Sequence, residues 1–307
     1  PNYLGIYDSN GHVRRDDAGH VIPGKFEDVE RIIPDLQEKG YSYIYLMAMY
    51  QLDKAENIIG QAGPDASMFS PLKFAVSQEQ GGEEALQAVI EKAESYGIKV
   101  IVDLIPHVNQ SFQDLPEWAL VKARAGRVVR RLATDGSINH EDGSPVEWHD
   151  SVMLNWRDKR VLDAYLDWIR ELIGMNVGGV RVDVAHHFGT MLPSEKSLLS
   201  KQKLFGQITS WERNEQGGFR TVSEWDATKG NPFLLYLVNA ISKEHPEFLF
   251  IGENYEQDIQ ILKSGVVPMN SGTHDDLEAA IIRGAGTQDL LNSHFRWLLG
   301  AIDPQAP

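Results

Sequence analysis

The chain has 307 residues, of which 42% are hydrophobic and 24% are charged, and its formal charge at pH 7 is −15. This is ordinary globular composition, sufficient for one large or two small domains. The negative charge argues against nucleic acids and anionic membranes as partners, because both would be repelled. The absence of cysteine excludes disulfides, thiol catalysis and cysteine metal sites, and it leaves the cellular compartment open.

Strand and helix patterns alternate along the first part of the chain. Short apolar segments predict strands at residues 3–7, 43–47 and 99–105. Between them, apolar residues at helical spacing predict two helices that end at Gly40 and at Gly97, where glycine suits a C-cap. Pro34 lies inside the first of these helix patterns and should kink the helix or remove one of its hydrogen bonds.

The second part of the chain begins with a segment at residues 106–150 that is too long for an ordinary connection. We therefore expect a barrel in two parts, residues 1–106 and 151–307, separated by an inserted loop subdomain at residues 107–150. The later patterns predict a helix at 162–173, a strand at 180–184, a helix from Pro232, strands at 248–252 and 266–269, and helix-like stretches at 277–283 and 290–299.

Consecutive strand and helix units indicate a parallel sheet with crossover helices. An open doubly wound sheet would favour a G-x-G-x-x-G or Walker sequence, and the chain has neither. Carboxylates end three of the predicted strands, at Asp103, Asp183 and Glu253, and in a barrel such residues converge on one face. We therefore predict an α/β fold, a (β/α)8 TIM barrel that the chain provides incompletely, with an irregular insertion after the third strand.

Buried charges at the strand ends suggest acid–base chemistry. Arg181 and Asp183 alternate with valines, and on a buried strand both charges need partners. Taken alone, this pattern is better explained as a structural ion pair. The repetition of strand-end carboxylates favours glycoside hydrolysis, which needs one carboxylate as nucleophile or base and one protonated acid. Retaining enzymes hold the two about 5 Å apart, a distance that neighbouring barrel strands can supply.

A metal-dependent barrel hydrolase is the rival interpretation. Its ligands would come from Asp103, His107, Asp183, His186 and His187. Such barrels commonly carry H-x-H on an early strand, and residues 3–7 contain no histidine. The pattern therefore favours the glycosidase, and the metallohydrolase stays open.

Residues 179–187 read G-V-R-V-D-V-A-H-H, which resembles the G-F-R-x-D-x-x-K-H motif of the alpha-amylase family of retaining glycoside hydrolases and transglycosidases. The resemblance extends over about residues 3–276. Ile251-Gly252-Glu253 is similar to the family's strand-five signature, and His274-Asp275 resembles its N-H-D. The resemblance implies that Asp183 is the nucleophile, Glu253 the general acid/base and Asp275 the transition-state stabiliser.

The same resemblance implies substrate-binding residues for an α-glucan or oligosaccharide. Arg181 would favour the ionised form of Asp183, and His187 and His274 would contact sugar hydroxyls. Phe69, or Phe74, stands where the family carries a sugar-stacking tyrosine. The remaining substrate-binding candidates are Asp103, whose role is either direct or the positioning of Arg181, and His107.

The first family motif, D-x-x-x-N-H, departs from its pattern here, since residues 103–108 read D-L-I-P-H-V. His107 replaces an asparagine that usually ligates a structural calcium, and Val108 replaces a subsite histidine. We therefore expect no cofactor and an altered calcium site. His186 and Thr273 depart from the family's lysine and asparagine in the same way, so the resemblance is to a divergent member.

We expect a retaining enzyme that cleaves α-glucosidic bonds through a glycosyl-Asp183 intermediate, which then passes to water or to a sugar hydroxyl. The alternative is a non-catalytic relative that binds sugar or a protein. Only 21 residues lie between Glu253 and Asp275 (275 − 253 − 1), too few for two crossovers and a strand. We therefore expect a stretch of the barrel to be absent between about residues 264 and 273, and another at the C-terminus.

Overall fold

A computed structural model describes residues 12–19, 22, 24–47, 49–51, 69–109, 115–120, 151–156, 158–185, 210–213, 219–222, 232–253 and 259–269. The chain divides into two compact units, Pro1–Asn155 with Asp163–Arg181, and Trp156–Leu162 with Val182–Pro307. In the described part, no helix combines the length and the apolar character that a membrane span needs.

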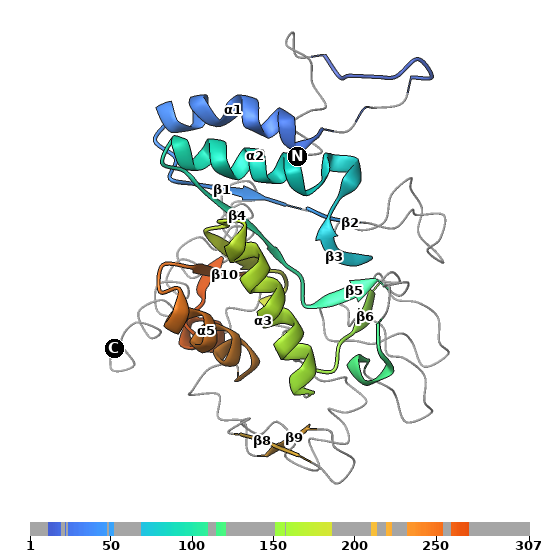
Figure 1. Ribbon diagram of the computed structural model, residues 1–307, viewed down its shortest axis with the longest axis vertical. Helices are drawn as coiled ribbons and strands as arrows, with labels where there is room; N and C mark the ends of the chain where they lie inside the picture. Colours follow the sequence, from blue (N-terminus) through green and yellow to red (C-terminus); the bar gives the residue numbers. More distant parts are fainter. Residues whose placement is uncertain are drawn as a thin grey trace, which may run out of the picture. The chain divides into compact units, whose positions relative to one another are not determined.

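The first unit is built on strand–helix repeats. Strand β1 (Tyr43–Leu46) pairs in parallel with β4 (Lys99–Leu104). The helices α1 (Phe26–Glu38) and α2 (Gly82–Ser95) lie side by side (Figure 1). All residues of β4 except its first are buried, as in a parallel strand that is covered on both faces. The helices and strands predicted between residues 26 and 105 are confirmed.

Each of these helices ends in the same hydrogen-bonded turn before the next strand. After α1, Gly40 has φ +82° and the N–H of Tyr41 donates to the carbonyl of Leu36 at 3.1 Å. After α2, Gly97 has φ +73° and the N–H of Ile98 donates to the carbonyl of Ala93 at 2.9 Å. This is the Schellman motif, which satisfies late helix carbonyls and reverses the chain. The predicted glycine caps are confirmed.

Helix α3 (Lys159–Gly174) follows the same rule with asparagine in place of glycine. Asn176 has φ +65°, and the N–H of Val177 donates to the carbonyl of Leu172 at 3.0 Å. Asparagine is among the residues that tolerate this left-handed conformation best after glycine. The predicted helix at 162–173 is therefore confirmed, together with its turn into the next strand.

Four short antiparallel strands in the first unit were not predicted. Strand β2 (Tyr50–Gln51) pairs antiparallel with β3 (Lys73–Val76), and β5 (His107–Asn109) pairs antiparallel with β6 (Ser151–Met153). The second pair brings together the two ends of the segment for which we predicted an inserted subdomain, and the subdomain itself stays a prediction. Single turns of 3₁₀-helix lie at Gln78–Gln80 and Glu117–Ala119.

An aromatic cluster joins α3 to the β2–β3 hairpin. The ring of Phe74 lies 5.0 Å from that of Tyr165 and 6.1 Å from that of Trp168. The Trp168 indole donates to the Tyr50 hydroxyl at 3.0 Å, and the Tyr50 hydroxyl donates to the backbone carbonyl of Asp103 at 2.6 Å. The cluster therefore fixes the backbone at the carboxyl end of β4.

The second unit continues the alternation. Helix α5 (Pro232–Glu244) begins at the predicted proline and leads to β10 (Leu249–Glu253), which pairs in parallel with β11 (Val267–Met269). Within the described part of the connection between these strands lies α6 (Ile259–Lys263), a helix of five residues. A two-stranded hairpin is formed by β8 (Ser210–Arg213) and β9 (Phe219–Val222). The strands predicted at 248–252 and 266–269 are thus confirmed within one residue.

Strand β7 (Gly179–Val182) is shorter than predicted. We expected it to run over residues 180–184, but it ends at Val182 because Val184 has φ +37°, which no strand residue adopts. In the first unit the parallel strands occur in the hydrogen-bonded order β1-β4-β7, and in the second unit β10 pairs with β11, as predicted for successive crossovers. The elements predicted at residues 3–7, 277–283 and 290–299 lie outside the described residues.

Replacement of Gly97 should show the cost of its left-handed backbone. A methyl group at this position meets no atom within 4 Å, so the penalty is conformational alone. We expect Gly97→Ala to lower the free energy of unfolding by about 1 kcal/mol. Gly174→Ala is the matched control, because Gly174 also has open space but lies in α3 with ordinary helical φ. The control should raise stability by about 0.5 kcal/mol in urea unfolding, and equal effects would contradict this account.

Replacement of Gly252 should show the opposite limitation, a lack of space. A Cβ atom there would lie 2.8 Å from Val266 Cγ1, 2.9 Å from Ile261 Cγ2 and 3.0 Å from Ala185 Cβ. We expect Gly252→Ala to lower the free energy of unfolding by about 1–3 kcal/mol. In a Val266→Ala background, which removes the closest of these atoms, the same change should cost less. Strictly additive effects of the two substitutions would show that crowding is not the cause.

Candidate active site

The first group of candidate residues surrounds a buried ion pair in the first unit. Asp103 is the penultimate residue of β4 and has a fully buried side chain, and Arg181 of β7 donates from Nη1 to its Oδ1 at 3.2 Å. The Tyr45 hydroxyl of β1 donates to the same oxygen. Both buried charges therefore have a partner, which is the condition for keeping ionised groups in a protein interior.

Two aromatic rings lie against the guanidinium of this pair. The Cζ atom of Arg181 lies 5.4 Å from the ring centre of Phe69 and 5.9 Å from that of Tyr45. At these distances a cation is attracted to an aromatic face. The structure thus brings together Asp103, Arg181 and Phe69, three of the predicted site residues.

Tyr45 was missed by the sequence analysis. It pairs with Ile101 in the β1–β4 register, so its side chain comes from the strand beside the one that carries Asp103. A polar aromatic residue in an apolar parallel strand, at the end where the other candidate residues lie, was the available signal.

The hydroxyl of Tyr50 holds the backbone of Asp103 through a hydrogen bond. Burial raises the pKa of Tyr50 far above its usual value, and the negative charge of Asp103 adds to this effect, while the hydrogen bond from Trp168 opposes it. The phenol therefore stays protonated, and it remains a donor to the Asp103 backbone carbonyl. The backbone that carries the Asp103 carboxylate is held by a partner that does not titrate.

The second group lies in the second unit and contains two buried carboxyl groups. Asp183 is 3% exposed and Glu253 is 7% exposed. The backbone N–H of Val184 donates to Oε2 of Glu253 at 2.9 Å. Because Val184 follows Asp183 directly, the Glu253 carboxyl lies against the backbone next to Asp183. A nucleophile and an acid/base on one sugar require two carboxyl groups gathered in this way.

The two groups share one segment of the chain. Arg181 and Asp183 are separated by Val182 alone, so the motif at residues 179–187 supplies the cation of the first group and a carboxylate of the second. This is the physical reason for the alternation of charged residues and valines that the sequence shows.

The residues of the altered first motif, 103–108, are buried. His107 and Val108 lie on β5, where they pair with Met153 and Val152 of β6. Among the residues that the structure describes, no three His, Cys, Asp or Glu side chains are placed to hold an ion. Calcium prefers six to eight oxygen ligands, and the imidazole of His107 is not one of them. The described residues do not fit a calcium site at this motif.

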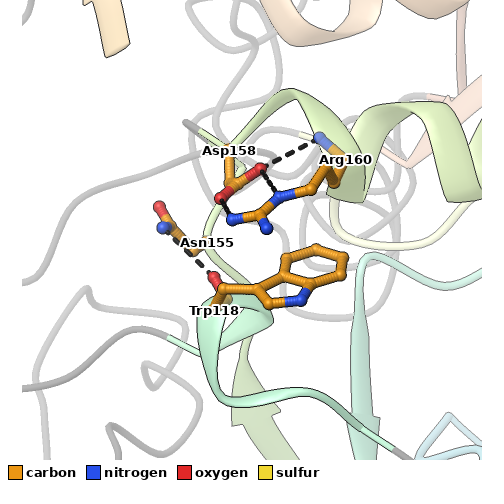
Figure 2. A network of polar contacts seen from close by, with 4 residues as sticks. All are labelled: Trp118, Asn155, Asp158 and Arg160. Atoms are coloured by element: carbon orange, nitrogen blue, oxygen red, sulfur yellow. Dashed lines mark hydrogen bonds and ion pairs between the residues drawn. The ribbon is translucent and has the colours of Figure 1, made fainter. Parts of the chain in front are cut away.

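Figure 2 shows the polar contacts around the segment that precedes α3. The Asn155 side chain donates to the Trp118 carbonyl at 3.5 Å. The Asp158 carboxylate accepts bonds from the Arg160 backbone N–H at 3.0 Å and from its Nε at 2.8 Å, which caps the start of α3. Burial alone would raise the pKa of Asp158, but the bonds from Arg160 outweigh it and the pKa lies below its usual value.

Four of the predicted site residues lie outside the described residues. These are His186, His187, His274 and Asp275. Their roles as substrate ligands and as transition-state stabiliser, together with the metal-binding alternative for the two adjacent histidines, stay predictions.

No family model matches the chain. Over 257 residues the chain is 22% identical to an alpha-1,4-glucan:maltose-1-phosphate maltosyltransferase of Myxococcus xanthus. The aligned region covers 79% of this chain and 31% of that protein. Over 187 residues it is 22% identical to an alpha-amylase-related protein of Drosophila willistoni, and this aligned region covers 56% of this chain and 37% of that protein. The chain thus spans about a third of the length of these curated relatives.

Solved structures show the fold more directly. The chain is similar to a maltogenic alpha-amylase from Thermotoga neapolitana with a TM-score of 0.62 at 13% identity, over 91% of this chain and 53% of that one. An alpha-amylase from Lactobacillus plantarum gives a TM-score of 0.58 at 15% identity, over 95% and 58%. The predicted (β/α)8 barrel, of which the described strands form part, is confirmed. In sequence the chain is similar to these maltosyltransferase and alpha-amylase-related proteins, and in fold it is similar to alpha-amylases.

Proposed function

We propose that the chain belongs to the catalytic barrel of a retaining glycoside hydrolase or transglycosidase that acts on α-glucosidic bonds of oligo- or polysaccharides. The observation that carries the proposal is the hydrogen bond between Glu253 and the backbone N–H of Val184, beside Asp183. Two buried carboxyl groups at neighbouring positions suit the two-step chemistry of retaining enzymes. The names of the relatives, a maltosyltransferase and amylases, support the same substrate class.

In the first step, the Asp183 carboxylate attacks the anomeric carbon while Glu253 gives its proton to the glycosidic oxygen. The bond between that carbon and that oxygen breaks, and a glycosyl-Asp183 ester forms. In the second step, a water molecule or a sugar hydroxyl gives its proton to Glu253 and attacks the same carbon, which releases Asp183. The choice between water and sugar decides between hydrolysis and transfer.

The first group of residues would act through Asp183. Arg181 is held by Asp103, Tyr45 and Phe69, so its charge has a defined position two residues before the nucleophile. A fixed positive charge favours the ionised form of a nearby carboxylate. We assign Asp103 a positioning role for Arg181, and we assign sugar contacts to His187 and His274 and transition-state stabilisation to Asp275.

A covalent label tests this proposal. We expect the full-length protein, incubated with 5-fluoro-α-glucosyl fluoride, to gain one glycosyl group on Asp183, as located by mass spectrometry of peptides. Asp183→Asn should abolish the label, and both Asp183→Asn and Glu253→Gln should abolish turnover of maltooligosaccharides, because each removes a covalent or proton-transfer role. Azide should restore the activity of Glu253→Ala on an activated substrate.

The control for these variants is Asp158→Asn, which changes a buried carboxyl group at the start of α3. It should keep turnover, because an asparagine can still cap the helix. Wild-type rates in Asp183→Asn or Glu253→Gln would end the glycosidase proposal. Sugar binding without turnover would support the non-catalytic relative.

We propose further that the reaction needs no metal or other cofactor, and we expect activity to survive treatment with EDTA. The proposal is supported by His107, which stands where the family has a calcium ligand and offers nitrogen instead of oxygen. The measurement is the rate of maltooligosaccharide cleavage before and after chelation. Loss of activity that a transition metal restores would favour the metal-dependent hydrolase.

A further inference from the structure

We propose that the backbone N–H of Val184 is a positioning group that determines which oxygen of Glu253 carries the catalytic proton. The bond runs to Oε2 at 2.9 Å, so the proton is assigned to Oε1. This inference rests on the proposed function, because it specifies how the acid/base of that reaction is oriented.

The conformation of Val184 is the first reason. Its φ of +37° lies in the left-handed region, which a β-branched residue rarely enters. Such residues persist only where the surrounding structure holds them, and they gather at functional sites. Here the side chain of Val184 is buried, with 5% exposure. The next residue, Ala185, packs so closely on Gly252 that a Cβ atom added to Gly252 would lie 3.0 Å from the Ala185 Cβ. The turn after Asp183 is thus locked by packing against the strand that carries Glu253.

The chemistry of a carboxyl group is the second reason. When protonated, it has one O–H donor, and its other oxygen is available only as an acceptor. A proton on Oε2 would oppose the N–H of Val184 and break a buried hydrogen bond. Protonated Glu253 therefore carries its hydrogen on Oε1. The N–H of Val184 favours this arrangement and keeps its own proton throughout.

The same bond favours proton transfer. When Oε1 gives its proton to the glycosidic oxygen, Glu253 becomes a carboxylate and the bond from Val184 becomes charge-assisted, which strengthens it. Interactions that strengthen as charge develops lower the barrier, and fixed backbone donors do so without reorganisation. In the second step, Oε1 takes a proton back from water or a sugar hydroxyl while Oε2 keeps its partner.

The test replaces this N–H by an oxygen. In the full-length protein, Val184 is exchanged for its α-hydroxy acid, which gives an ester linkage and keeps the side chain. An unactivated maltooligosaccharide needs the proton of Glu253, whereas maltosyl fluoride releases fluoride without one. We expect kcat/KM for the maltooligosaccharide to fall by about 10- to 100-fold, as for a lost hydrogen bond to a charged group. For the fluoride, kcat/KM should stay within about threefold, since protonation of the leaving group is not required.

Two matched variants keep the N–H. Val184→Ala and Val184→Gly remove the buried side chain but leave the amide donor in place, so both should change the ratio of the two kcat/KM values less than the ester does. Glu253→Gln is the benchmark for a lost proton donor. Equal losses on both substrates in the ester variant, or no loss on either, would overturn the inference.

A measurement without turnover covers the case in which the ester variant does not fold. In ¹H–¹⁵N spectra, the Val184 amide proton should move upfield in Glu253→Ala and should exchange faster with solvent. An unchanged resonance would contradict the bond and the inference. If the wild-type protein turns over neither substrate, the proposed function fails and the catalytic role of the N–H fails with it, while this resonance still reports on the bond.

Discussion

The buried ion pair between Asp103 and Arg181 is the interaction on which the strand ends depend. Neither charge is stable alone in an apolar surrounding, and loss of one partner from such a pair typically costs about 3–5 kcal/mol. Tyr45 and Phe69 complete the surroundings of the guanidinium. Arg181 stands two residues before Asp183 in the sequence, so the partner of Asp103 and the proposed nucleophile belong to one short segment.

Further contacts hold the strand ends. At β4, the hydroxyls of Tyr50 and Tyr165 donate to the backbone carbonyls of Asp103 and Ile105, each at 2.6 Å. At β10, Gly252 permits close packing with Ala185, and Glu253 receives the N–H of Val184. Backbone donors and buried phenols thus orient the candidate residues, and this explains how an apolar barrel interior accommodates several carboxylates.

Local patterns in the sequence predicted the long helices, the parallel strands and the glycine caps, because each rests on residues close in the chain. The family motifs also identified Asp103, Arg181, Asp183 and Glu253 as candidates. The strands of two to four residues in the β2–β3 and β5–β6 hairpins were missed because they are too short to show periodicity. The bond between Val184 and Glu253 depends on a positive φ and on a partner 69 residues away, and neither appears in a local pattern.

The distance along the chain between Asp103 and Arg181 has a consequence for synthesis. The two residues are 78 positions apart, and at about 5–20 residues per second Arg181 emerges from the ribosome about 4–16 s after Asp103. During that interval, the apolar strand β4 is available while the carboxylate at its end has no cation. Burial of this strand before Arg181 has been made would leave the Asp103 carboxylate without its cation, which carries a free-energy cost.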